Sequence, residues 1–219
     1  MQIAIVGWGS LVWCPRDLQI STKWRSDGPL LPVEYARKSK HDRVTLVLVP
    51  WEWVDRSATY WAHSCHTDLP EACDNLMNRE AIRAARHIHF ATLEESGSFG
   101  GETPHPDSAD VFETVQAWIA TQRGVDAAVW TGLPHKEFPR TRETELAADV
   151  VSYLRGLGGE ARDRAKEYVR YTPQSVRTPV RAAIERDLGW TPMPLPGHLF
   201  TGSGGPASRL MKLFSLKRE

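Results

Sequence analysis

The first residues that could do chemistry form a glycine turn near the start of the chain, Gly7-Trp8-Gly9-Ser10-Leu11. The turn follows the apolar run Gln2 to Val6, which is typical of a short buried strand. A dinucleotide-binding fingerprint needs a third glycine and a later acidic residue, and Val12 stands where that glycine should be. We therefore interpret the segment either as a plain glycine-rich turn or as a set of exposed N–H groups that bind an anion.

The second candidate is a carboxylate on the apolar side of an expected helix. Asp68 and Glu71 form a capping-box-like start, and Pro70 falls in the first turn, where it is tolerated. At about 100° per residue, Glu80 lies about 20° from Leu69, within the apolar stripe. Burial disfavours the charged form of a carboxyl unless a partner compensates it. Glu80 is therefore either a buried glutamate satisfied by an arginine or by backbone, or a general base or acid.

A third possibility is a metal site, because histidines and cysteines gather in one part of the sequence: His63, Cys65, His66, Cys73, His87 and His89. A zinc site needs three or four converging ligands. On the expected elements His63 and Cys65 share a strand face, but His66 points away and Cys73 faces the core. We expect ordinary core and surface side chains here, with no metal and no other cofactor.

The composition limits the partners of the chain. Its 219 residues include 27 Lys and Arg against 27 Asp and Glu, so the formal net charge is zero. A nucleic-acid partner usually requires a basic excess, so we expect none. Three scattered cysteines without a C-x-x-C motif, no basic leader and no long apolar stretch predict a cytoplasmic protein with no membrane partner.

The elements that must position these residues run from strands to helices. We expect strands over 2–6, 32–38, 43–49, 57–63, 86–93 and 127–131, and helices from 68 and over 108–122, 146–157 and 178–188. A long surface loop is expected over 95–107. Because no helix separates the first four strands, an antiparallel meander is favoured over repeated βαβ units. This order predicts one α+β domain over 1–200, followed by a flexible basic tail over 201–219 with Arg209, Lys212, Lys217 and Arg218.

Several of these segments, in order and spacing, resemble the gamma-glutamylcyclotransferase-like superfamily. The glycine turn resembles that superfamily's glycine–tyrosine–glycine–serine–leucine opening, with Trp8 in place of the tyrosine. The segment from Asn75 to Glu80 resembles its catalytic helix, which ends in an Arg-Glu pair. The segments 37–39 and 43–48 look like its strands. The resemblance covers about residues 1–95 and, more loosely, 127–131.

The resemblance implies a small mixed or antiparallel β-barrel flanked by helices, and metal-independent chemistry. The α-amine of a gamma-glutamyl group attacks its own side-chain carbonyl and releases pyroglutamate together with an amine or peptide. It implies that Glu80 is the catalytic base and that Trp8, Gly9, Ser10 and Leu11 bind the small-molecule substrate. Because Trp8 lacks a hydroxyl, the alternative is a non-catalytic member that binds a small acidic ligand or a partner protein in the same cleft. A His/Cys metal hydrolase is a third alternative.

Overall fold

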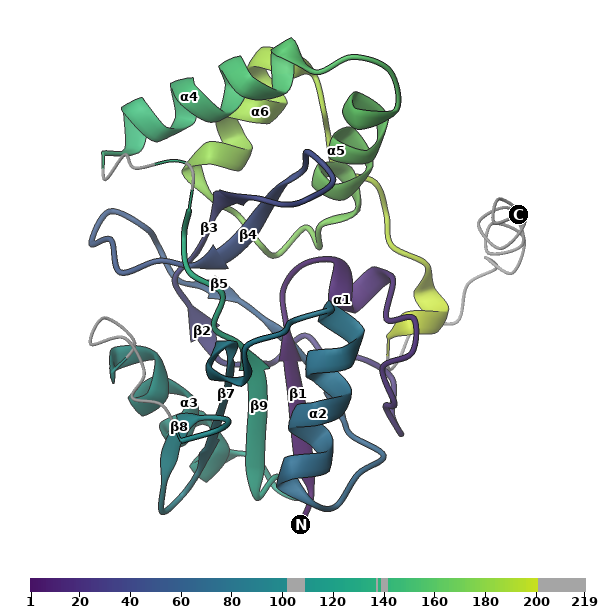
Figure 1. The fold of residues 1–219 in the computed structure, drawn as a ribbon, viewed down its shortest axis with the longest axis vertical. Helices are drawn as coiled ribbons and strands as arrows, with labels where there is room; N and C mark the ends of the chain where they lie inside the picture. Colours follow the sequence, from purple (N-terminus) through teal and green to yellow (C-terminus); the bar gives the residue numbers. More distant parts are fainter. Residues whose placement is uncertain (102–108, 137, 139–141, 201–219) are drawn as a thin grey trace.

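The computed structural model describes residues 1–101, 109–136, 138 and 142–200, and its largest sheet is a mixed sheet of five strands (Figure 1). In spatial order the strands are β6 (Tyr60–His63), β1 (Ile3–Gly7), β9 (Ala127–Thr131), β7 (Ile88–Thr92) and β8 (Ser96–Ser98). The pair β1–β9 is parallel and the other pairs are antiparallel. The carboxyl ends of β1 and β9 therefore meet at the same edge of the sheet.

Helices cover both faces of this sheet. On one face, α2 (Leu69–Glu80) packs through Cys73 and Leu76 against strand residues such as Ile5 and Val129. On the other face, α3 (Ala109–Thr121) packs through Val115 against a cluster that includes Trp130. A short 3-10 turn, η1 (Ala85–His87), leads into β7. The sheet is therefore buried on both sides, as its apolar strands require.

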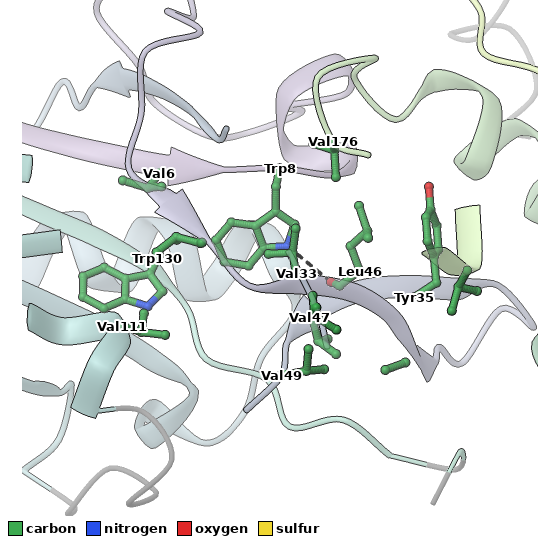
Figure 2. Packing of buried hydrophobic residues seen from close by; sticks show 14 of the residues in the cluster. Val6, Trp8, Val33, Tyr35, Leu46, Val47, Val49, Val111, Trp130 and Val176 are labelled. Atoms are coloured by element: carbon green, nitrogen blue, oxygen red, sulfur yellow. Dashed lines mark hydrogen bonds between the residues drawn. The ribbon is translucent and has the colours of Figure 1, made fainter. Parts of the chain in front are cut away.

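A second layer is built on a β-hairpin and three helices. The hairpin consists of β3 (Val33–Lys38) and β4 (Val44–Leu48), and the helices are α4 (Glu143–Gly156), α5 (Gly159–Tyr171) and α6 (Pro179–Leu188). The short strands β2 (Leu30–Leu31) and β5 (Ser57–Ala58) pair beside it, and a 3-10 turn, η3 (Gly197–Leu199), follows α6. Figure 2 shows Trp8, Trp130 and hairpin residues such as Val33 and Leu46 packed together, so one hydrophobic cluster joins the hairpin to the large sheet.

The predicted fold class and most predicted elements are confirmed. The fold is α+β with six helices in the described residues. The side chain of Asp68 accepts a hydrogen bond from the Glu71 N–H at the start of α2. In the same way Thr178 caps α6, which ends at Gly189 in the left-handed conformation. These signals are local, which is why they can be read from the sequence.

The predicted antiparallel meander is wrong. The strands expected over 2–6, 32–38, 43–49 and 57–63 are distributed over three sheets, and only the β3–β4 hairpin joins two consecutive ones. The interior strand β1 takes one neighbour, β6, from later in the group and the other, β9, in parallel from more than a hundred residues away. Hydrophobic patterning determines which segments become strands but says little about which distant strand becomes the neighbour.

Two further expectations are corrected. The loop expected over 95–107 contains strand β8, and residues 102–107 lie outside the described part. Helix α5 is not among the expected helices, because Gly158 and Gly159 follow the helix expected over 146–157 and such glycines are typical of a helix end. Gly159, with a φ of 50°, instead begins α5. Only Ala165, Tyr168 and Val169 are buried along α5, a stripe too narrow to stand out in its charged sequence.

Three remaining expectations concern a closed barrel, a membrane partner and the C-terminal tail. No closed barrel is found among the described residues, where the strands form one five-stranded and two two-stranded sheets. None of the helices in the described ranges is long and apolar enough to cross a membrane. The tail predicted over 201–219 lies outside the described residues.

Candidate active site

The glycine turn leaves the carboxyl end of β1 and runs into a single helical turn, α1 (Ser10–Trp13). The Val12 N–H donates to the Gly9 carbonyl at 3.0 Å, and the Cys14 N–H donates to the Ser10 carbonyl at 2.8 Å. The N–H groups of Ser10 and Leu11 come before these bonds, and the first N–H groups of a helix have no partner within it. They are therefore the donors that the turn can offer.

Arg79 fastens this turn to the end of α2. Its side chain is 4% exposed and its Nη1 donates to Glu80 Oε1 at 2.6 Å. Nη2 donates to the carbonyls of Ser10, at 3.0 Å, and Cys14, while Nε donates to the Pro15 carbonyl at 3.2 Å. Because both Nη atoms and Nε have acceptors, Arg79 holds the Glu80 carboxylate and the glycine turn in one fixed arrangement.

Glu80 is the last residue of α2, and its side chain is 22% exposed. The buried side of α2 ends with Arg79, and Glu80 lies at the edge of that side. Ala81 follows in the left-handed conformation, with a φ of 52°, and closes the helix. One interpretation of Glu80 from the sequence is a glutamate paired with an arginine, and Arg79 is that partner. Oε1 accepts from it, while Oε2 has no hydrogen bond to any described residue.

Tyr168 of α5 lies directly against the turn. A Cβ atom on Gly9 would stand 2.5 Å from the Tyr168 hydroxyl oxygen, so glycine is needed there for space. The same oxygen accepts the Leu46 N–H at 3.3 Å. Burial raises the pKa of Tyr168 to about 12, and the Glu80 carboxylate adds to this while Arg43 acts against it. The hydroxyl is therefore protonated at neutral pH. Sequence reasoning missed Tyr168 because it missed α5.

The four residues predicted to bind substrate differ in their accessibility. Trp8, Gly9 and Leu11 are buried and Ser10 is half-buried. The Trp8 ring is 5% exposed and lies in the core, where its Nε1 donates to the Leu46 carbonyl at 3.4 Å (Figure 2). The Trp8 indole thus ties the turn to β4, and the turn can offer a ligand its backbone N–H groups and the Ser10 side chain.

A groove follows the outer side of α5. It has a volume of about 450 Å³ and is lined by Asp163, Arg164, Lys166, Glu167, Arg170, Tyr171 and Met193. The Tyr171 ring lies 5.5 Å from the ring of Trp13, the last residue of α1. One face of α5 therefore packs against the glycine turn through Tyr168, and the adjacent face of the same helix lines an open, mostly charged groove.

The histidines and cysteines lie on different parts of the fold. Cys73 is buried on α2, Cys65 is exposed, and His89 is buried on the opposite face of the sheet between Phe112 and Trp130. Among the residues that the structure describes, no three His, Cys, Asp or Glu side chains come together in a way that could hold a metal ion.

No protein-family model, curated protein or solved structure matches this chain.

Proposed function

We propose that this chain is a gamma-glutamylcyclotransferase-like enzyme, which releases pyroglutamate and an amine or peptide from a gamma-glutamyl substrate. The observation that carries the proposal is the Arg79 clamp, which holds the Glu80 carboxylate against the Ser10 end of the glycine turn. One guanidinium thus bridges a proton acceptor to the backbone of Ser10, whose N–H is one of the donors of the turn, and this supports the proposal. The small β-barrel of that superfamily and a cytoplasmic location belong to the same proposal.

Glu80 supplies the general base. The α-ammonium of a gamma-glutamyl group is not a nucleophile until it loses a proton, and Glu80 Oε2 is the free acceptor beside the turn. The α-nitrogen then forms a bond to the side-chain carbonyl carbon, and the bond from that carbon to the leaving nitrogen breaks. The proton held by Glu80 passes to the leaving nitrogen. The ring nitrogen gives up its second proton through the same carboxylate, and the released amine takes this proton up. The products are pyroglutamate and an ammonium, and the Glu80 carboxylate is regenerated.

The glycine turn supplies N–H groups that stabilise the negative charge formed during the reaction. Negative charge develops on the carbonyl oxygen in the tetrahedral intermediate, and backbone N–H groups such as those of Ser10 and Leu11 stabilise such charge. The clamp by Arg79 and the close contact of Tyr168 with Gly9 fix the turn before substrate arrives. Ring closure within one molecule also gains from proximity, with effective molarities that reach about 10⁵ M or more.

One observation favours the second candidate, a non-catalytic protein that binds a small acidic ligand. Glu80 forms an ion pair with the buried Arg79, and this pair alone gives Glu80 a structural role. The two candidates separate in a single assay, in which the protein is incubated with a library of gamma-glutamyl amines and peptides and pyroglutamate is measured by mass spectrometry. Turnover of any member supports the enzyme. Binding of a member without turnover supports the second candidate and contradicts the first.

A further inference from the structure

Arg43, the residue before β4, is a half-buried cation close to the candidate site. Its Nε is buried and has no hydrogen-bond partner, and it forms no ion pair with any described residue. By contrast, the buried Arg79 and Arg181 are bonded on all three nitrogens, Arg79 as above and Arg181 to three backbone carbonyls and Glu185. A guanidinium nitrogen removed from water without an acceptor is unfavourable, so Arg43 has an unfilled requirement for one.

The surroundings of Arg43 connect it to the glycine turn. Its guanidinium carbon lies 5.6 Å from the centre of the Tyr168 ring, and the hydroxyl of that ring stands over Gly9. Arg43 and the turn therefore contact the same tyrosine. Since a substrate with two charged ends spans several ångströms, one that sits at the turn has Arg43 within reach.

Glu167 of α5 is an anionic group whose charge interacts with that of Arg43. Burial raises the pKa of Glu167, and the positive charge of Arg43 acts against that rise. They nevertheless form no ion pair, and Glu167 instead lines the groove beside α5. None of the described carboxylates is therefore paired with Arg43, and its Nε still needs an acceptor.

We propose that Arg43 binds a carboxylate of the ligand that enters the glycine-turn site. A guanidinium presents parallel N–H donors that match the two oxygens of a carboxylate, and this pairing is among the strongest hydrogen-bonded contacts in proteins. The identity of the ligand as a gamma-glutamyl compound rests on the proposed function, and the role of Arg43 does not require turnover. Such a compound has two possible carboxylates, one on the glutamyl α-carbon and one on the leaving group.

The test is equilibrium binding to the full chain carrying Glu80→Gln, which removes the proposed base and so keeps the ligand intact. The probes are gamma-glutamylglycine and two analogues, in which either the α-carboxylate or the glycine carboxylate is a carboxamide. Each is measured with Arg43, with Arg43→Met and with Arg43→Lys. Lys40→Met serves as the matched control, because Lys40 is an exposed cation of the same hairpin.

We expect Arg43→Met to weaken gamma-glutamylglycine binding about 10- to 100-fold, and Arg43→Lys to restore part of the loss. The analogue that lacks the bound carboxylate should be insensitive to Arg43→Met, which identifies the carboxylate. An equal loss of affinity for all three probes on Arg43→Met, the same loss in Lys40→Met, or no binding by the protein that retains Arg43 overturns the proposal. If Arg43-dependent binding is found while the unsubstituted protein releases no pyroglutamate, the proposed function fails and the role of Arg43 stands.

Discussion

Glu34 and Glu80 are both at least partly withdrawn from water, and they are held in opposite ways. Glu34 on β3 is 0% exposed and has only neutral partners: the N–H groups of Tyr35 at 2.6 Å and Val180 at 3.3 Å, and the hydroxyl of Thr178. Glu80 keeps 22% of its side chain exposed and has one cationic partner, Arg79. Burial raises the pKa of Glu34 to about 7, whereas its hydrogen bonds act in the opposite direction.

The comparison shows that depth of burial alone does not mark a catalytic carboxylate. Both oxygens of Glu34 are used to hold the start of α6 against β3, so the group has no access to a substrate. Glu80 leaves one oxygen unbonded at the edge of the glycine turn. We therefore assign Glu34 to structure and Glu80 to chemistry, although Glu34 has the more strongly altered environment.

The largest expected effect on stability comes from removing the Glu34 side chain. Glu34→Ala leaves two buried N–H groups and one hydroxyl without their acceptor and opens a cavity, so we expect a loss of about 3 kcal/mol in the free energy of unfolding. Urea unfolding near pH 6 measures it. Glu94→Ala, at an exposed position, is the control. A loss below about 0.5 kcal/mol, as for a surface change, would show that Glu34 does not hold α6.

The protonation of Glu34 predicts an unusual pH dependence. Its folded pKa, about 7, lies above the ordinary 4.5, so the folded state binds the proton more tightly than the unfolded state. The contribution to stability is therefore complete below pH 4.5 and is lost as the pH rises through 7, by about 3 kcal/mol in total. Glu34→Gln should remove this dependence from unfolding curves recorded between pH 5 and 8. An unchanged slope in that variant would contradict the assignment.

His89 should act in the opposite direction over nearly the same range. Burial lowers its folded pKa to about 4, so its contribution is complete above 6.5 and is lost as the pH falls through 4. The two groups therefore offset each other between about pH 4.5 and 6.5. In the Glu34→Gln protein we expect stability to fall on acidification through this range, which the intact pair conceals. An increase in the stability of the Glu34→Gln protein on acidification would contradict a destabilising effect of His89 protonation.

On the Glu80 side, the contact between Gly9 and Tyr168 predicts a rescue. Gly9→Ala places its Cβ 2.5 Å from the Tyr168 hydroxyl oxygen but 3.4 Å from the ring carbon that bears it. We expect Gly9→Ala to cost about 1–3 kcal/mol of stability by overpacking, and Tyr168→Phe to recover much of it. A double-mutant cycle of thermal unfolding measures the coupling. Simple additivity would show that the hydroxyl does not press on the turn.

The smallest expected effect is that of Tyr168→Phe alone. Phenylalanine fits the same space but leaves the buried Leu46 N–H without its acceptor, for about 1 kcal/mol. The turn also loses the hydroxyl oxygen that packs against Gly9, so kcat/KM for a gamma-glutamyl substrate should fall as well. A variant with reduced stability and unchanged kcat/KM would place Tyr168 in the core only.

What could be predicted from the sequence follows the range of the interactions. The cap at Asp68, the helix that it begins and the helix over 178–188 depend on neighbours within a few residues, and the sequence predicts them. The bonds from Arg79 to Ser10 and Cys14 span more than sixty residues, and no periodic pattern encodes them. Tyr168 was missed with its weakly apolar helix. An acidic residue between apolar neighbours, as Glu34 lies between Val33 and Tyr35, is a signal in the sequence that points to this buried carboxyl.

The central claim is that Glu80 is the group that moves the proton, and its most direct test is pyroglutamate release by Glu80→Gln. With a substrate found in the library, we expect kcat/KM to fall about 10²- to 10⁴-fold, because an amide cannot accept the proton. Asp74→Asn, at an exposed carboxylate of the same helix, should retain full activity, and thermal unfolding should show both variants folded. Pyroglutamate release by folded Glu80→Gln at the rate of the unsubstituted protein would contradict the claim.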